Sequence, residues 1–220
     1  MSIKQNRRDL LKLAGLGGVV FASNLVGCAS HKAQPAMLAS SGAAKHRLPR
    51  DDFFFLQLSD THWGYSGAAN PEADMTLKKT VETINASSVQ PDFIVFTGDL
   101  THTTDDAAVR RKRMGEFKQI VSALKVKDVR FLPGEHDASP DKGAVYREMF
   151  GETHYAFDHK GIHFVALDNV SDSTSLVGDE QIAWLEGDLK KTDPETPVVV
   201  LTHRPLFDLY PQWEWATKDG

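Results

Sequence analysis

The sequence contains almost no cysteine, since Cys28 is the single such residue among 220. One cysteine excludes an intramolecular disulfide, so the fold does not depend on an oxidising compartment. The sequence also lacks an excess of basic side chains, because its net charge is -5 at pH 7. Proteins that bind nucleic acids normally show a basic face, and we therefore expect no nucleic-acid partner.

Long apolar runs are scarce as well. A transmembrane helix needs about 20 apolar residues, whereas the weakly apolar stretch near the N-terminus covers only residues 13–26. The stretch follows Arg7 and Arg8, which resemble a twin-arginine export signal, and it fits the core of a signal peptide. The alternative is a basic amphipathic terminus without a targeting role.

Cys28 ends the sequence Leu25-Val26-Gly27-Cys28, which resembles the lipobox of bacterial lipoprotein precursors. This resemblance implies cleavage before Cys28 and lipidation of its thiol, and several acyl chains on one residue would anchor the protein stably to a membrane. The alternative is a buried free thiol. Residues 29–50 consist mostly of Ala, Ser, Lys, His and Pro, a composition typical of a flexible linker.

We therefore predict three segments: an export signal at residues 1–27, a lipidated cysteine with a flexible linker at residues 28–50, and a folded domain at residues 51–220. We expect the protein to be exported, and to be lipid-anchored in the periplasm or the cell envelope through Cys28. The folded segment has roughly 170 residues, enough for a single hydrophobic core.

Short, nearly continuous apolar runs in the folded segment predict buried parallel strands. They cover residues 53–58, 93–96, 129–132 and 198–201. Two further runs, at 155–158 and 162–167, are joined by a link that contains Gly161 and predict a β-hairpin.

Helical patterns separate these strands. Asn70 and Pro71 predict one helix start, and Asp105 with Asp106 predicts another. A short helix is expected at residues 145–150, and a later helix is expected to turn Ile182, Leu185 and Leu189 inward. This order predicts one α/β domain, a mixed-sheet sandwich with helices outside.

Four short motifs follow the predicted parallel strands. They are Asp60-Thr61-His62, Gly98-Asp99, Gly134-Glu135-His136-Asp137 and Thr202-His203. Side chains that leave the carboxyl ends of neighbouring parallel strands meet at one crevice of the sheet. Carboxylates gathered so closely repel one another unless a cation is present, so the pattern predicts a metal site.

The order and spacing of these motifs resemble the calcineurin-like metallophosphoesterase family. The resemblance implies two metal ions that share a carboxylate and a water. It assigns Asp60 and His62 to one metal, Asp99 to both, and Glu135 and His203 to the second. It also implies that His136 contacts the phosphate or protonates the leaving oxygen, and we expect Asp137 to fix the tautomer of the His136 ring.

The function implied is hydrolysis of phosphate mono- or diesters of small molecules, with manganese, iron or zinc as divalent or mixed-valence ions. Two departures from the family stand out. Glu135 replaces an asparagine, and it either binds metal through oxygen or points away to pair with Arg130 or Arg204. The family's later Gly-His-x-His motif is also absent, so we expect these 220 residues to be truncated at the C-terminus and the domain incomplete.

Two other functions are compatible with the sequence. A non-catalytic exported lipoprotein could retain the fold as a binding or scaffold module, although the presence of all the acids and imidazoles favours an enzyme. A purely structural metal protein is disfavoured, because structural zinc sites usually close with cysteine or histidine. Outside the motifs, His102 either lines the cleft or is a loop histidine, and Asp168 and Asn169 either support the site or form a turn.

Overall fold

The computed structural model describes residues 52–208 and 210–219. The export signal, Cys28 and the linker lie outside the described residues, and the expectations for them stay predictions. Within the described part of the chain, no helix is long and apolar enough to cross a membrane.

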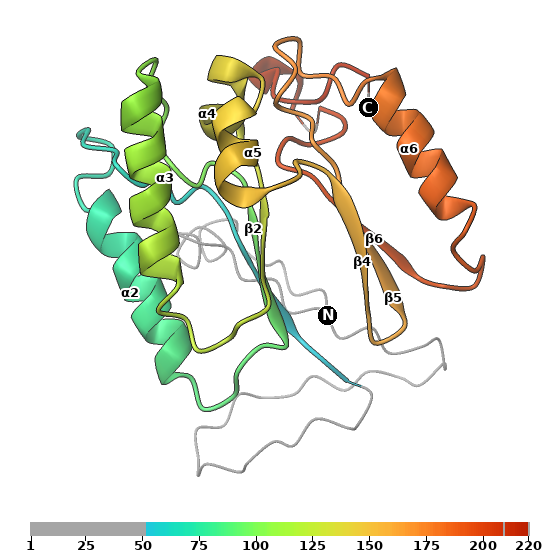
Figure 1. Ribbon diagram of the computed structural model, residues 1–220, viewed down its shortest axis with the longest axis horizontal. Coiled ribbons are helices and arrows are strands. Elements are labelled where there is room, and N and C mark those ends of the chain that lie inside the picture. Colours follow the sequence, from blue (N-terminus) through green and yellow to red (C-terminus); the bar gives the residue numbers. More distant parts are fainter. Residues whose placement is uncertain (1–51, 209, 220) are drawn as a thin grey trace, which may run out of the picture.

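The first sheet is parallel and carries the order β1-β2-β3 (Figure 1). Its strands are β1 (Phe55–Leu58), β2 (Phe93–Thr97) and β3 (Val129–Leu132). All five residues of β2 are buried, as expected for a central strand covered on both faces. The three apolar runs of the sequence therefore form the predicted parallel strands.

Helices cover the outer face of this sheet: α2 (Ala73–Ala86), α3 (Ala107–Val121) and α5 (Ala144–Phe150). Helix α3 begins as predicted, because the Asp106 side chain accepts hydrogen bonds from the amides of Ala108 and Val109. Helix α2 begins later than Pro71, after Glu72. The core beneath these helices includes Leu77, Phe96, Met114 and Phe117.

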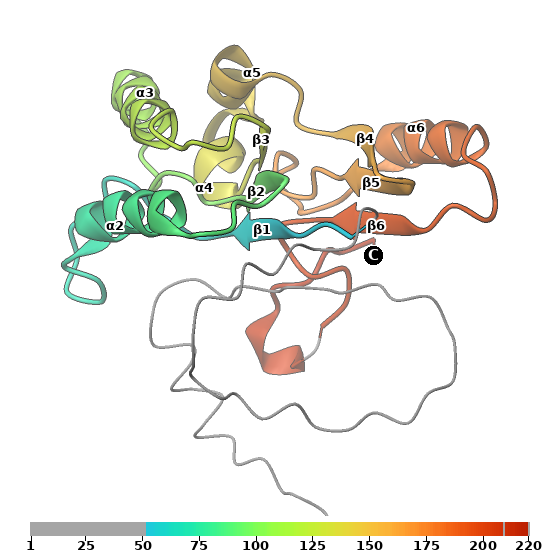
Figure 2. The ribbon, with the colours of Figure 1, turned by 90° about the horizontal axis from the view of Figure 1, so that it is seen from below.

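The second sheet is mixed, since β4 (Tyr155–His159) pairs antiparallel with β5 (Ile162–Ala166), which pairs parallel with β6 (Val198–Leu201). An aromatic layer joins the two sheets. Phe93 stacks on Phe55 at 4.8 Å between ring centroids and meets Phe164 edge-to-face at 5.3 Å, both favourable aromatic geometries. The mixed-sheet sandwich with helices outside is confirmed (Figure 2).

Helix α6 (Asp179–Leu189) covers the outer side of the second sheet, but its predicted inward face is wrong. Ile182 and Leu189 are 38% and 39% exposed, whereas Gln181 is buried. The Gln181 side chain takes the inward position because it hydrogen-bonds both the amide and the carbonyl of Asp168. Buried backbone groups need such partners, and an apolar side chain cannot supply them.

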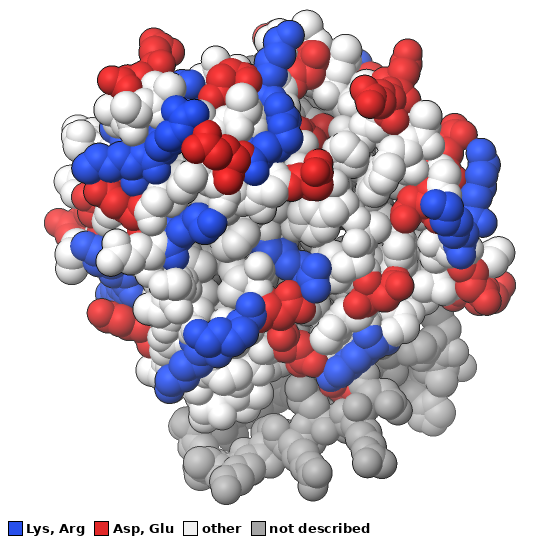
Figure 3. All heavy atoms as spheres, viewed as in Figure 1, with Lys and Arg blue, Asp and Glu red and all other residues white. Residues whose placement is uncertain are grey.

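Three short helical segments complete the chain: α4 (Glu135–Ala138), η1 (Ser139–Asp141) and η2 (Pro211–Trp213). Trp213 stacks on Trp215, and both side chains are more than half exposed. On the face of the described residues shown in Figure 3, acidic and basic side chains are mixed across the surface.

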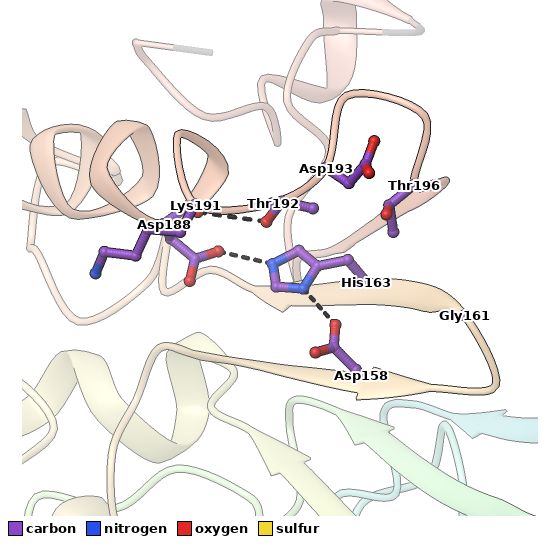
Figure 4. Close-up of a pocket in the computed structure, with 8 residues that line it drawn as sticks. All are labelled: Asp158, Gly161, His163, Asp188, Lys191, Thr192, Asp193 and Thr196. Atoms are coloured by element: carbon purple, nitrogen blue, oxygen red, sulfur yellow. Dashed lines mark hydrogen bonds and ion pairs between the residues drawn. The ribbon is translucent and has the colours of Figure 1, made fainter.

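A cavity of about 480 Å³ lies between the β4-β5 hairpin and the end of α6 (Figure 4). His163 in its wall has a 9% exposed side chain, and each of its ring nitrogens lies 2.7 Å from a carboxylate, Nδ1 from Asp158 and Nε2 from Asp188. Burial lowers the pKa of His163, but the hydrogen bonds to both carboxylates outweigh it, and the pKa is raised above its ordinary value. His163 therefore joins β4, β5 and α6 through two carboxylates that favour its protonated ring.

We expect His163→Gln to lower the free energy of unfolding by about 1–3 kcal/mol in acidic buffer, because two charge-assisted hydrogen bonds are lost. This stabilisation is fully present below the pKa of the unfolded chain and is lost as pH rises through the raised folded pKa. Urea unfolding of both proteins across the pH range measures the difference. His159→Gln is the matched control, since one carboxylate faces that ring. A difference that does not shrink with rising pH would contradict the protonated ring.

Candidate metal centre

Backbone hydrogen bonds hold together the two loops that follow β1 and β2. The amide of Asp60 donates to the Gly98 carbonyl at 3.0 Å, and the amide of His62 donates to the Asp99 carbonyl at 2.9 Å. A parallel bridge between Trp63 and Thr101 continues this pairing beyond the strands. Asp60, His62 and Asp99 all have positive φ angles, and His62 Nε2 lies 3.7 Å from Asp60 and 3.4 Å from Asp99.

Asp99 lies at the centre of the cluster and is 3% exposed. Its carboxylate oxygens lie 3.4 Å from His62 Nε2, 3.7 Å from His203 Nε2 and 3.8 Å from His136 Nε2. Burial raises the pKa of Asp99 to about 6, and the negative charge of Glu135 adds to the rise. Nearby positive charge favours the ionised form of this carboxylate and lowers its pKa.

Glu135, the first residue of α4, and His203, which follows β6, close the cluster on its other side. Glu135 Oε2 lies 2.8 Å from His203 Nε2, and Glu135 Oε1 lies 3.5 Å from Arg204. Burial opposes ionisation of Glu135, but His203 and Arg204 outweigh it and hold the pKa at about 2. Of the two predicted arginine partners, Arg204 is near Glu135, whereas Arg130 pairs with Asp128.

The His203 ring is fixed from behind, because Nδ1 donates to the Thr97 carbonyl at 2.7 Å. Burial lowers the pKa of His203, but the hydrogen bond to Glu135 and the charge of Asp99 outweigh it and raise this pKa to about 9. Nε2, the atom that faces both carboxylates, therefore carries the proton that the ring loses when it becomes neutral and offers a lone pair. Gly98 allows this approach: it has φ +104°, and a Cβ there would lie 2.4 Å from His203 Nδ1. Any side chain at position 98 would displace the ring.

The donor atoms suit divalent metal ions. Asp60, Asp99 and His203 offer ligand atoms within 4.8 Å of one another, and so do Asp99, Glu135 and His136. Asp99 belongs to both groups. The groups differ from the predicted ligand sets, in which His62 joins Asp60 and His203 joins Glu135, although each of these predicted pairs is also close, at 3.7 Å and 2.8 Å. Carboxylate oxygens with imidazole nitrogens are the ligands preferred by manganese, iron and zinc. The residues therefore fit a pair of cations that share Asp99.

The sequence profile of the calcineurin-like phosphoesterase family matches residues 55–218, the part of the chain that forms the sandwich and its metal-binding side chains. The chain belongs to the calcineurin-like phosphoesterase family. The family was expected from the four motifs, and this match confirms it.

Relatives of the chain include proteins named as phosphodiesterases. The chain is 30% identical over 182 residues to a cAMP/cGMP dual specificity phosphodiesterase of Mycobacterium tuberculosis, with 74% of this chain and 53% of that protein covered. It is 28% identical over 171 residues to a probable cyclic nucleotide phosphodiesterase of Rhodococcus erythropolis, with 72% and 54% covered. The chain thus spans about half the length of these relatives.

The fold of the chain is similar to that of a purple acid phosphatase from yellow lupin seeds. The TM-score is 0.55 at 17% sequence identity, over 76% of this chain and 36% of the phosphatase. This likeness concerns the fold alone.

The Asp137 side chain does not contact the His136 ring, so the prediction that it fixes the tautomer of this ring is wrong. Asp137 is fully buried, and its carboxylate accepts from the amides of Leu100, Thr101 and Gly134 and from the Thr101 hydroxyl. Burial raises the pKa of Asp137 to about 6, although these donors favour its charged form. Asp137 holds the loop after β2 and does not touch the reacting groups.

The amide of Thr103 takes the position expected for Asp137, since it donates to His136 Nδ1 at 3.2 Å. An accepted hydrogen bond requires a lone pair on Nδ1, so the proton of the neutral ring sits on Nε2. Burial, reinforced by the nearby His62, lowers the pKa of His136 and favours this neutral ring.

His102 lies beside His62 and His136, as the first of its two alternatives expects. Its ring centroid is 5.0 Å from that of His136 and 5.7 Å from that of His62. The three rings offer nitrogens within 4.8 Å of one another. The signal in the sequence was its position three residues after Asp99.

Asn169 supports the segment after His203, because it accepts from the Arg204 amide and donates to the Arg204 carbonyl. Asp168 forms a turn instead, accepting from the amides of Val170 and Ser171. Asn169 therefore holds a loop of the site, and Asp168 does not.

Proposed function

We propose that this domain hydrolyses phosphate mono- or diesters of small molecules with two divalent metal ions. The proposal rests on one observation above all: the buried carboxylate of Asp99 belongs to two overlapping groups of ligand atoms. We assign Asp60 and His62 to the first metal, Glu135 and His203 to the second, and Asp99 to both. The phosphodiesterase names of the relatives support ester hydrolysis.

The chemistry supplied by such a metal pair is Lewis acidity toward the phosphoryl oxygens and a lowered pKa for the attacking water. The residues of the chain would hold the metal ions and orient the groups around them. Asp99 is kept between the two ligand groups by accepting from the His136 amide at 3.0 Å. His136 Nε2 carries its proton on the side that faces Asp99, where it can donate to the leaving oxygen of an ester.

A direct test measures metal content and ester hydrolysis on the same preparation of the full chain. We expect elemental analysis to find divalent metal, and hydrolysis of para-nitrophenyl phosphate or bis-para-nitrophenyl phosphate to disappear on chelation and return on adding metal. Metal binding without hydrolysis of either ester would favour the binding or scaffold module, and absence of both would reject the proposal.

Glu135 bears on which metals the centre prefers. We expect Glu135→Asn to shift metal preference away from manganese and iron and toward zinc, because a neutral amide oxygen replaces a hard carboxylate. Titration of both proteins with the three metals measures the shift. The Glu152→Asn variant is the matched control, since this exposed acid lies outside the cluster. Unchanged affinities for all three metals would place the Glu135 side chain outside the coordination shell.

We further propose that the protein is exported and lipid-anchored through Cys28. The support is the sequence Arg7-Arg8 and the lipobox resemblance around Cys28. We expect Cys28→Ala to move the protein from the membrane fraction to the soluble fraction, because the acylated thiol is lost. Fractionation followed by immunoblotting measures the shift. A variant that stays in the membrane fraction uncleaved would indicate that residues 13–26 act as an anchor instead.

A further inference from the structure

One face of helix α3 reaches both loops of the metal centre. Arg113 donates from Nη1 to the carbonyls of His102, at 2.8 Å, and Thr103, at 3.1 Å. One turn away along the helix, Glu116 accepts from the indole N–H of Trp63 at 3.0 Å. The helix therefore fixes the loop after β1 and the loop after β2 with two side chains.

The Arg113 contact bears on the His136 ring through a single peptide group. The carbonyl of His102 and the amide of Thr103 belong to the same peptide bond, in which C=O and N–H point in opposite directions. Arg113 binds the carbonyl end, while the amide end donates to His136 Nδ1 at 3.2 Å. A cation on the carbonyl also polarises the peptide and strengthens the hydrogen bond made by its N–H.

We propose that Arg113 is a positioning residue for His136. By fixing the plane of the His102–Thr103 peptide, Arg113 keeps the Thr103 amide donating to His136 Nδ1. The ring proton therefore stays on Nε2, the nitrogen that faces Asp99. The use of this proton in ester hydrolysis rests on the function proposed above. The position of the proton on the His136 ring does not depend on that function.

The packing around Arg113 leaves its guanidinium little freedom. Gly64 has φ +85°, and a Cβ at that position would lie 2.6 Å from Arg113 Nε. The arginine therefore lies directly against the backbone of the loop after β1. On the opposite side of the loop after β2, Asp137 holds the amides of Leu100 and Thr101. Arg113 thus holds the peptide that faces His136, and Asp137 holds the two residues that precede it.

The test compares Arg113→Met, which keeps the aliphatic stem and removes the donors, with Arg111→Met on the same helix. Arg111 pairs with the exposed Glu148 and does not reach the loop. Long-range proton–nitrogen NMR of the ring, assigned with His136→Ala, reports the tautomer in the zinc-loaded protein. We expect the proton on Nε2 in the wild type and in Arg111→Met, and a mixture of tautomers in Arg113→Met.

Two ester substrates separate positioning from simple damage. We expect Arg113→Met to lose about tenfold in rate on an alkyl phosphate, less than the roughly 10²- to 10⁴-fold supplied by a whole proton donor, and to change little on para-nitrophenyl phosphate. The para-nitrophenolate released from this ester is a good leaving group that needs no proton. Metal content should be unchanged, and Arg113→Lys, which can still donate to the carbonyl, should restore part of the rate and of the tautomer.

An Nε2 proton in Arg113→Met, or equal losses on both esters, would overturn the proposal. If Arg113→Met does not fold, the His136 tautomer and the rates on the two esters are measured on Arg113→Lys instead. A rate loss that differs between the two esters while the tautomer stays that of the wild type would contradict the proposal. If the wild type hydrolyses no ester, the proposed function fails, and the tautomer of the arginine variants still decides the role of Arg113.

Discussion

Asp99→Asn is expected to lose most of its bound metal and to hydrolyse phosphate esters about 10³-fold more slowly. The metal pair is expected to supply several kcal/mol of transition-state stabilisation, and about 1.4 kcal/mol corresponds to a tenfold change in rate. Asparagine keeps the shape of the side chain and an oxygen for the His136 amide, so the loss reports the shared negative charge. Elemental analysis and ester hydrolysis measure the two effects together.

The matched control for this variant lies just before the same strand. Asp92 precedes β2 and pairs with His159 and Lys160, whereas Asp99 follows the strand at its other end. We expect Asp92→Asn to lose these ion pairs while keeping metal and rate. Normal metal content and turnover in Asp99→Asn would refute the assignment of Asp99 as the shared ligand.

The second large effect is expected for His136→Ala. Because our assignment gives His136 to neither metal although it lies in one of the ligand groups, this variant should retain its metal. It should lose roughly 10²- to 10⁴-fold in rate, the range typical of a positioned proton donor. The loss should be largest for alkyl esters, because an alkoxide leaves poorly without a proton. Steady-state rates on alkyl and nitrophenyl phosphates, measured beside metal content, provide the comparison.

His154→Ala controls for the removal of an imidazole as such. His154 packs edge-to-face on Trp184, at 4.7 Å between ring centroids, and takes no part in the ligand groups. We expect it to leave both rates unchanged. A His136→Ala enzyme that handles alkyl esters as well as the wild type would show that the leaving oxygen is protonated by another group.

The strand positions and the ligand cluster could be predicted from the sequence, because both follow from local patterns. Apolar runs mark buried strands, and a polar motif after each strand must emerge at the same sheet edge. Asp60, Asp99 and His203 therefore meet although they are far apart along the chain. The inward face of α6 could not be predicted, since Gln181 is buried by hydrogen bonds to a distant turn rather than by apolar character.

The role expected for Asp137 failed for a geometric reason. Consecutive residues of a helical turn point about 100° apart, so the neighbour of His136 in the sequence is poorly placed to reach its ring. The partner that does so, the Thr103 amide, is a backbone group and carries no side-chain signature. The contacts of Arg113 with two backbone carbonyls likewise could not be predicted, because no sequence motif indicates them.

The left-handed backbone at Asp60, His62 and Asp99 has a consequence for evolution of this domain. Residues with a Cβ lose about 1–2 kcal/mol each in this conformation, and glycine at these positions would relieve the strain. Selection for thermal stability alone should therefore favour glycine at these positions, at the expense of the proposed ligands. A bound cation opposes these substitutions, because it stabilises the native state of the protein that keeps its ligands. Directed evolution for heat resistance alone should accordingly erode this centre, whereas selection in the presence of metal should retain it.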